Sequence, residues 1–155
     1  MVTKTERAQR YWEDVNEGDD VPGFELPLTA TQIVLQVSGS QDFYQVHHDP
    51  EFARAGGHPD IFVNTGFTTA SFGRLLSSYV GDKGWVKKFH MEMRRMNHPG
   101  DVMKLTGKVI RKYIEGDEHL LDLEVWAENQ RIGVTTPSTA TVRLPSRQQA
   151  AAKTG

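Results

Sequence analysis

The longest apolar pattern in the chain covers residues 61–80 and has the period of a helix. Apolar and small residues recur three or four positions apart in two neighbouring stripes, with Arg74 as the single charged residue among them. A helix with two adjacent apolar stripes is covered on most of its sides. The pattern therefore predicts a long central helix that ends at Gly81.

Beyond Gly84 the apolar positions alternate with polar ones. The alternation begins at Phe89, Met91 and Met93 and returns in three later segments, 102–111, 121–127 and 141–144. A period of two predicts strands, and Pro137 predicts that the last strand starts late or lies at an edge of the sheet. We expect four strands in antiparallel meander order.

The elements before the central helix are short. Residues 11–27 are acidic and interrupted by Gly and Pro, which predicts an irregular lead-in with one short strand. Thr29 or Thr31 can cap a helix that frays over 38–40, and Asp49 can cap a helical turn over 50–55. The only long apolar element that the sheet can cover is the helix over 61–80. We therefore predict an α+β fold in which an antiparallel sheet wraps around one central helix.

Composition restricts the class of protein. The chain has 155 residues, 37% hydrophobic and 25% charged, which suits one globular domain, expected over 11–145. The polar ends, 1–10 and 146–155, are expected to be disordered. The absence of cysteine excludes a disulfide scaffold, a thiolate nucleophile and Cys-based metal sites. No stretch resembles a secretory signal or a membrane span, so we expect a cytoplasmic protein.

The net charge of -2 conceals an uneven distribution. Residues 83–112 contain nine basic and two acidic side chains, and the rest of the chain is acidic. Such a sector attracts a compact polyanion, although a solvated strand face explains it equally well. The acidic balance and the lack of a recognition motif argue against nucleic acid as the partner.

The segment 38–50 contains the residues best suited to chemistry. Asp42 and His47 are five positions apart, so a regular helix would separate them by about 140° around its axis. In a loop between two helices they can converge, and a carboxylate beside an imidazole forms a general acid–base pair. The alternative is structural: Asp42 caps a turn and His47 bonds to the backbone.

Two other kinds of site fit the sequence poorly. His47 and His48 point to opposite sides if the chain is extended, and Asp49 is needed as a helix cap, so we expect no metal site. Acyl transfer by serine is disfavoured because the chain has no Gly-x-Ser-x-Gly motif.

The motif Asp42-x4-His47, followed by Asp49-Pro50 and Ala53, resembles the hydratase-2 motif of MaoC-like dehydratases. These are (R)-specific enoyl-CoA hydratases with a hotdog fold. The similarity extends over 11–145. Residues 42–43, 46–49 and 60–64 are most similar to one branch, the small catalytic subunits of actinobacterial steroid side-chain enoyl-CoA hydratases.

The resemblance implies a reaction and a site. The reaction is reversible hydration of a trans-2-enoyl thioester, with Asp42 and His47 as the catalytic pair. It needs no cofactor beyond the coenzyme A of the substrate. The oxyanion donor is implied to be a backbone N–H of Thr65 or Gly66. The family's His-Gly step is Asn64-Thr65 here, and its Asn-Pro between Asp and His is Tyr44-Gln45. Residues expected to bind substrate are Asn64 and, toward the coenzyme A phosphates, Lys87, Lys88, Arg94 and Arg95.

The resemblance also implies a partner, either a second copy or another MaoC-like chain, with the acyl tunnel at the interface. Three other functions remain open: a silent subunit, an acyl-CoA-binding module and a hotdog thioesterase. The last usually needs a carboxylate on the central helix, and 61–80 has none. Ser71 is the nearest counterpart of a helix serine that assists some family members.

The small residues of the central helix bear on substrate size. Together with nearby methionines they can leave volume for a bulky or ring-bearing acyl group. Alternatively, they let the helix pack closely on the sheet or on a second central helix. These residues are Thr65, Gly66, Thr69, Ala70 and Gly73, and the methionines are Met91, Met93 and Met96.

Overall fold

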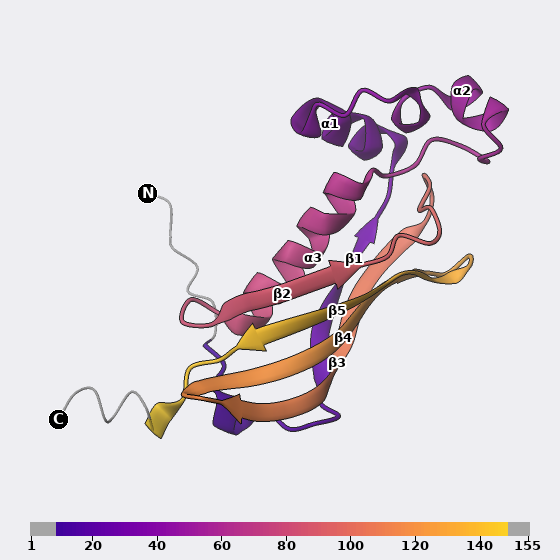
Figure 1. Cartoon of the computed structure of the whole chain (residues 1–155). Coiled ribbons are helices and arrows are strands. Elements are labelled where there is room, and N and C mark those ends of the chain that lie inside the picture. The colour runs from indigo at the N-terminus through magenta and orange to yellow at the C-terminus, as the bar shows by residue number, and fades with distance from the viewer. Residues whose placement is uncertain (1–8, 149–155) are drawn as a thin grey trace.

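The computed structural model describes residues 9–148 and contains one five-stranded antiparallel sheet in the order β1-β3-β4-β5-β2 (Figure 1). The strands are β1 (Asp20–Pro27), β2 (Trp85–Met91), β3 (Val102–Glu115), β4 (Glu118–Asn129) and β5 (Gly133–Arg143). The α-helices are α1 (Ala30–Ser40), α2 (Pro50–Ala55) and α3 (Thr65–Val80), with short 3-10 turns at Trp12–Asp14 and Gln45–His47.

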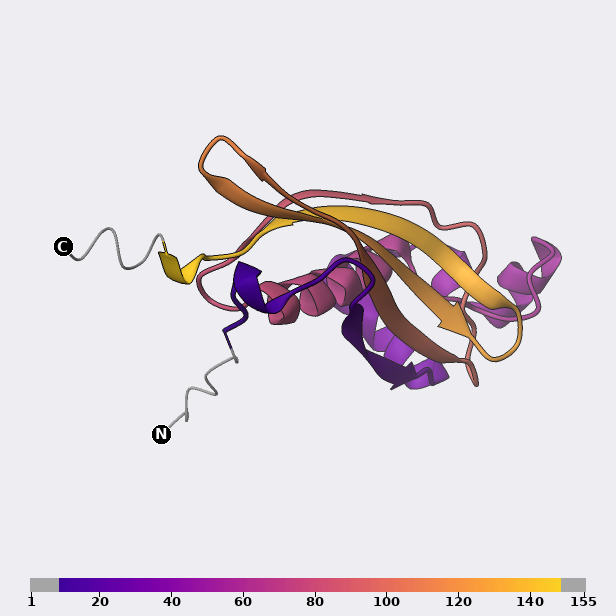
Figure 2. The same ribbon diagram turned by 90° about the horizontal axis from the view of Figure 1, so that it is seen from below.

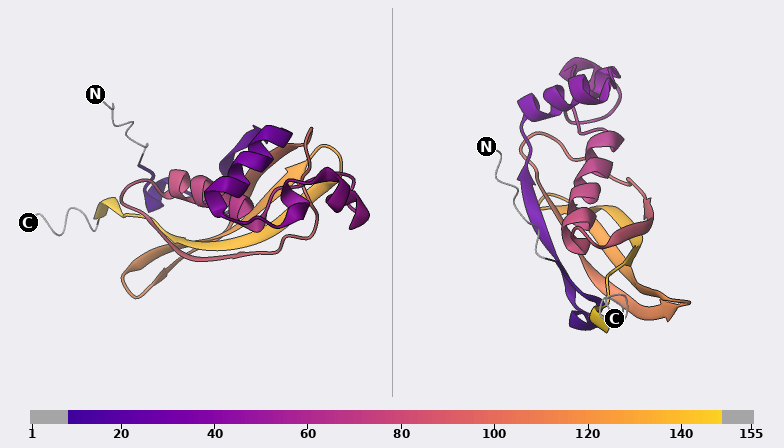
Figure 3. Two further views of the ribbon diagram at one scale, coloured as in Figure 1. Left: turned by 90° about the horizontal axis from the view of Figure 1, so that it is seen from above. Right: turned by 90° about the vertical axis from the view of Figure 1, so that its left-hand side faces the viewer.

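The sheet curls around α3, as the two turned views show (Figures 2 and 3). Phe72, Leu75 and Leu76 on the buried side of α3 join one hydrophobic core with alternate residues of the strands, such as Leu105 and Leu123. Helices α1 and α2 lie together at one end of the molecule, beyond the start of α3 (Figure 1). This is the predicted α+β hotdog fold, which the structure confirms.

The predicted strand order was wrong for β2. Strands β3, β4 and β5 form the expected meander, but β2 pairs with β5 at the edge of the sheet and not with β3. The connection between β2 and β3, residues 92–101, is too long for a tight hairpin and long enough to cross the end of the sheet.

The last strand begins earlier than Pro137 predicted. β5 starts at Gly133, lies between β4 and β2, and includes Pro137 opposite Trp126. In an antiparallel strand the N–H and C=O of one residue point to the same neighbour. The Pro137 carbonyl accepts from Glu92 N, and β2 has already ended at Met91. Proline has no backbone N–H, and here that N–H would point to a part of the chain that no longer pairs with β5 as a strand.

The central helix begins at Thr65, not at Ile61. Residues 61–64 are extended, with Phe62 N donating to Val46 O and Val63 N to Asn97 O. The Asn64 side chain caps the helix by accepting from Phe67 N. Buried residues continue across this boundary, so apolar spacing alone could not locate it.

The two predicted caps before α3 are present. Thr29 forms a capping box with Gln32 at the start of α1. Asp49 accepts from the N–H groups of Glu51 and Phe52 at the start of α2. α1 does not fray over 38–40 but continues to Ser40, where Gln41 adopts the left-handed conformation (φ 57°) and turns the chain toward Asp42.

The ends of the chain were expected to be disordered, and residues 1–8 and 149–155 lie outside the described residues. The described parts of both ends bond to the fold. Gln9 Nε2 donates to Val80 O, Arg10 donates to Tyr79 O, and Ser146 bonds to Glu13. Between residues 9 and 148, no helix has the length and apolar character needed to cross a membrane.

Candidate active site

The structure brings Asp42 and His47 together. Asp42 follows the left-handed residue at the end of α1, and His47 closes the turn Gln45–His47, so both lie in the loop between α1 and α2. His47 Nε2 lies 3.5 Å from Asp42 Oδ2. The His47 side chain is 8% exposed and the Asp42 side chain 42%, so the pair has one buried and one accessible member.

The backbone determines which nitrogen of His47 carries a proton. His47 Nδ1 lies 2.8 Å from the carbonyl oxygen of Phe62. A carbonyl can only accept, so Nδ1 must be the donor and Nε2 of the neutral ring presents a lone pair toward Asp42. The ring is also enclosed by edge contacts with Phe62 and Tyr44, at centroid distances of 5.0 and 6.3 Å.

With the His47 ring neutral and Asp42 ionised, the two side chains face each other as two acceptors. At 3.5 Å neither can satisfy the other, because no hydrogen lies between them. A water molecule beside them can donate one hydrogen to each. The arrangement is suited to holding a water and moving its protons.

Asn64 connects this pair to the start of α3. Its side chain is buried, with 2% of the residue exposed. Nδ2 donates to Asp42 Oδ2 at 3.0 Å and to Ser40 Oγ at 2.9 Å, while Oδ1 accepts from Phe67 N at 2.8 Å. The sequence suggested that Asn64 binds substrate, but every polar atom of its side chain is bonded to protein.

The first two backbone N–H groups of α3 are available for a ligand. Thr65 and Gly66 open the helix, where N–H groups have no acceptor within the helix, and Asn64 takes only the N–H of Phe67. Both residues are exposed and directly follow Asn64, which contacts Asp42. The helix dipole favours negative charge at this position.

A buried polar cluster supports the extended segment before α3. His98 Nδ1 donates to the carbonyls of Ile61 (3.0 Å) and Asp60 (3.1 Å). The carboxylate of Asp101 accepts from His98 N at 2.9 Å and from the guanidinium of Arg131. The segment that carries the Phe62 carbonyl is therefore fixed from both sides, by His47 and by His98.

Charge compensation keeps Asp101 ionised. Burial alone would raise the pKa of Asp101, but the hydrogen bonds from Arg131 and from His98 N outweigh it and hold the pKa below its ordinary value. No sequence signal pointed to Arg131, which lies thirty residues away from Asp101.

The basic sector over 83–112 does not form one cationic surface. Four of its members make ion pairs: Lys87 with Glu118, Arg94 with Glu92, Lys104 with Glu128, and Lys108 with Asp20. Many of its charges are thus balanced within the fold. The alternative explanation of this sector, a strand face exposed to solvent, accounts for these four basic residues.

The four candidate phosphate ligands lie in different places. Arg94 and Arg95 follow β2, whose end approaches the start of α3, where Thr68 Oγ1 contacts Met93 Sδ at 3.7 Å. Lys87 and Lys88 lie in the earlier half of β2, alongside β5. Of the four, only Arg94 and Arg95 belong to the segment that follows Met93, and their side chains bond to Glu92 and to the carbonyl of Ile132.

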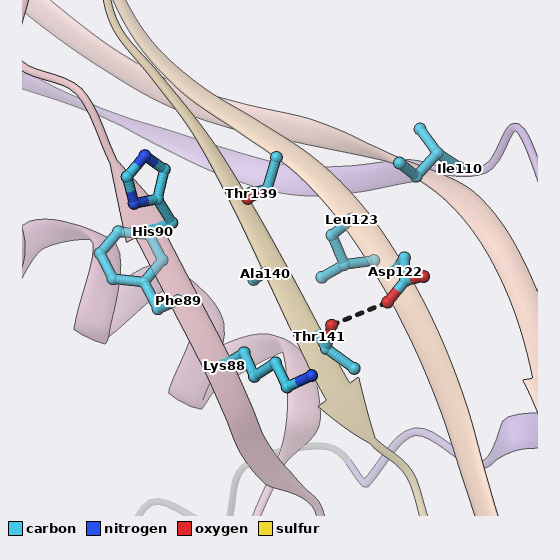
Figure 4. Close-up of a pocket in the computed structure, with 9 residues that line it drawn as sticks. All are labelled: Lys88, Phe89, His90, Ile110, Asp122, Leu123, Thr139, Ala140 and Thr141. Atoms are coloured by element: carbon cyan, nitrogen blue, oxygen red, sulfur yellow. Dashed lines mark hydrogen bonds between the residues drawn. The ribbon is translucent and has the colours of Figure 1, made fainter. Parts of the chain in front are cut away.

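Lys88 lines a separate hollow over β2, β5 and β4 (Figure 4). Its volume is about 390 Å³, and Thr141 Oγ1 donates to Asp122 at 2.8 Å within it. None of its lining residues belongs to the loop or helix start that carries Asp42, His47 and Asn64. A smaller hollow, about 350 Å³, lies next to the His47 ring and includes Tyr44 and Phe62.

His48 does not share the bonding partners of His47. Its Nε2 lies 3.1 Å from the carbonyl oxygen of Phe43, whereas His47 faces Asp42 and Phe62. Within 9–148, no three His, Asp or Glu side chains are grouped closely enough to hold a metal ion.

The small residues of α3 lie on its open side. Thr65, Gly66, Thr69, Ala70 and Gly73 are all exposed, and a Cβ added at Gly73 would meet no atom within 4 Å. The prediction that α3 is covered on most sides was wrong for the single chain, and close packing of helix on sheet does not explain these residues. Ser71 is buried, and its hydroxyl donates to Phe67 O at 2.8 Å.

No protein-family model matches the chain. Among curated proteins it is similar to the 3-oxo-4,17-pregnadiene-20-carboxyl-CoA hydratase beta subunit of Mycobacterium tuberculosis. The two are 29% identical over 92 residues, which cover 59% of this chain and 71% of that protein.

Solved structures agree with this similarity. The ChsH1-ChsH2 complex from Mycobacterium tuberculosis contains a chain that is 25% identical, with a TM-score of 0.74 over 84% of this chain and 98% of that one. The (R)-hydratase from A. caviae shares the fold at 19% identity, with a TM-score of 0.74 over 86% and 99% of the two chains. The fold, the Asp-x4-His motif and these relatives agree: the chain has a hotdog fold and is similar to the MaoC-like dehydratases and (R)-hydratases.

Proposed function

We propose that the chain is an enoyl-CoA hydratase, which adds water reversibly to a trans-2-enoyl thioester to give a 3-hydroxyacyl thioester. The observation that carries the proposal is the pairing of Asp42 with His47 beside the open N-terminus of α3. The pair supplies proton transfer and the helix start supplies charge stabilisation, which are the two requirements of this reaction.

In the proposed hydration, the pair holds a water molecule against the β-carbon. One member of the pair takes a proton from the water as its oxygen bonds to that carbon. The electrons of the double bond move to the thioester oxygen, and the pair then returns one proton to the α-carbon. Because one proton is taken and one returned, Asp42 and His47 end the cycle in their starting states.

The N–H groups of Thr65 and Gly66 are the proposed donors to the enolate-like thioester oxygen. They are exposed, they have no acceptor within the helix, and the dipole of α3 adds to their effect. Backbone donors do not depend on a side chain, so Thr65 can serve where the family has Gly. A Cβ added at Gly66 would lie 3.4 Å from Asn64 Oδ1, an ordinary van der Waals contact, so packing within the chain does not require Gly at the second position.

The proposed active form contains a second hotdog chain. The relative from Mycobacterium tuberculosis is named as a beta subunit, and the similar solved structure is a complex of two kinds of chain. The exposed side of α3 and the accessible carboxylate of Asp42 leave room for such a chain, or for a second copy of this one, to complete the acyl site. Arg94 and Arg95 are the proposed contacts for the coenzyme A phosphates.

The proposal is tested by assaying the purified chain, alone and co-produced with a MaoC-like partner, for hydration of enoyl-CoA. We expect loss of the conjugated enoyl thioester and formation of the 3-hydroxyacyl thioester. Binding of acyl-CoA without turnover in both preparations would support a silent or acyl-CoA-binding subunit instead. Release of free coenzyme A would support a thioesterase.

A further inference from the structure

Asn64 makes three hydrogen bonds that join separate parts of the site. Its Oδ1 caps α3 through Phe67 N, and its Nδ2 donates both to Asp42 and to Ser40 at the end of α1. The orientation of the amide is not arbitrary. Phe67 N–H can only donate, so Oδ1 must face it and the NH2 group must face Asp42.

The contact acts on the oxygen of Asp42 that matters for proton transfer. Asn64 Nδ2 lies 3.0 Å from Asp42 Oδ2, the same atom that lies 3.5 Å from His47 Nε2. Asp42 lies in a loop and its side chain is 42% exposed, so little packing restrains the rotation of its carboxylate. A donor from a residue that is 2% exposed therefore gives this carboxylate a fixed partner.

We propose that Asn64 is a positioning residue. It holds Asp42 Oδ2 toward His47, and it keeps Asp42 and His47 in a fixed position relative to the first N–H groups of α3. The inference rests on the proposed function, because its consequence for catalysis depends on that reaction. One side chain bonds to both the carboxylate and the helix cap. A shift of either part relative to the other would cost the Asn64 amide one of its bonds.

The two tasks explain why asparagine suits this position. Ser, Thr and Asp also cap helices well. Ser and Thr are too short to reach Asp42 from the cap, and Asp would place an acceptor against the Asp42 carboxylate. Asn combines a capping oxygen with a donor on the same rigid amide.

The test compares Asn64→Ser and Asn64→Asp with the wild type, each in the active form of the enzyme. Both variants keep a capping side chain, so we expect the melting temperature to change little. For Asn64→Ser we expect kcat to fall by about 10- to 100-fold with KM nearly unchanged, because the carboxylate is misplaced while the binding surface is intact. For Asn64→Asp we expect a larger loss, together with a shift of the acidic limb of the kcat–pH profile to higher pH.

Thr29→Ala is the matched control. It removes the capping box of α1 without touching Asp42, so it measures what weakening a helix cap alone does to kcat. In the pH profile, His47 is the titratable group that the described residues place against Asp42, and Asn64 and Ser40 are neutral. A shift of the acidic limb in Asn64→Asp but not in Thr29→Ala supports the positioning role.

Asn64→Ser with kcat within about twofold of the wild type would overturn the inference and leave the hydratase proposal standing. If the wild type has no hydratase activity, the proposed function fails, and a second measurement still decides the inference. The crystal structure of Asn64→Ser is compared with that of the wild type. The inference requires Asp42 Oδ2 to move away from His47 Nε2 in the variant, and an unchanged position would contradict it.

Discussion

At the scale of single residues, the chemistry depends on which atoms donate and which accept. The Phe62 carbonyl directs the proton of His47 to Nδ1, and Asn64 supplies the donor on Asp42. Asp42 and His47 were predicted from the sequence because their spacing forms a recognisable motif. The groups that orient them, an acceptor at position 62 and a donor at position 64, are distant in sequence, so their roles could not be predicted from local spacing.

Asp42→Asn and His47→Ala are each expected to lower hydratase turnover by roughly 10²–10⁴-fold, because each removes a proton-transfer group. Neither side chain belongs to the hydrophobic core, so the circular dichroism spectrum should remain that of the folded wild type. Turnover near the wild-type level in either variant would show that the pair is not catalytic.

His48→Ala is the matched control for the histidine. His48 bonds to the Phe43 carbonyl, and the ion pair of Asp42 is with His47, so removal of His48 should cost much less activity than His47→Ala. Equal losses in the two variants, measured as kcat/KM on the same substrate, would mean that the loop as a whole matters and not the nitrogen that faces Asp42.

At the scale of elements, the site depends on how α3 begins. The extended segment over 61–64 carries the Phe62 carbonyl and the Asn64 cap, and His98 and Asp101 fix it from the other side. Burial continues across the helix start, so hydrophobic periodicity predicted the helix but placed its first residue too early. The Asp101–Arg131 pair joins segments far apart in sequence and has no local pattern that could predict it.

Asp101→Asn should destabilise the fold in a pH-dependent way. The pKa of Asp101 is held below its ordinary value, so its contribution is fully present above about pH 4 and is lost as the pH falls through the folded value. We expect the variant to lose about 1–3 kcal/mol at pH 7, because charged hydrogen bonds become neutral ones. The difference from the wild type should shrink when urea unfolding is repeated near pH 3.

The control for this measurement is Asp20→Asn. Asp20 pairs with Lys108 on the surface, and its side chain is 79% exposed, so little change in stability is expected. A difference between Asp101→Asn and the wild type that is independent of pH would contradict the proposed role of the ionised carboxylate.

Gly73→Leu tests what the open side of α3 is for. A Cβ at Gly73 meets no atom within 4 Å, so the single chain has room for the side chain. Replacing Gly inside a helix should raise its stability by up to about 1 kcal/mol. If this side lines the acyl site, kcat/KM should fall selectively for long or bulky substrates. An equal loss for all substrates, or a loss of the oligomer in sedimentation, would assign it to chain association.

At the scale of the whole molecule, the fold presents the loop that carries Asp42 and His47 at one end and leaves one side of α3 open (Figure 1). The curled antiparallel sheet around a central helix was predicted from the change of apolar period at Gly84. The position of β2 at the edge of the sheet was not predicted, because the alternation of apolar and polar residues does not show which neighbour a strand pairs with.

Substrate size is expected to follow from this open surface. The methionines at the end of β2 can repack around irregular groups, and Met91 and Met93 contact Thr69 and Thr68 of α3. We expect a higher kcat/KM for bulky or ring-bearing enoyl-CoA than for crotonyl-CoA, measured with and without the partner chain. A clear optimum at short chains of about four to six carbons would contradict a bulky substrate while leaving the reaction type intact.

The central claim is that Asp42 and His47 hydrate an enoyl thioester. The most direct measurement incubates trans-2-enoyl-CoA with the wild type and with Asp42→Asn in ¹⁸O-labelled water, each with its partner chain present. The account predicts one ¹⁸O atom at the β-carbon of the product for the wild type and almost none for the variant. Equal incorporation by both proteins, or none by the wild type on any enoyl-CoA, would contradict it.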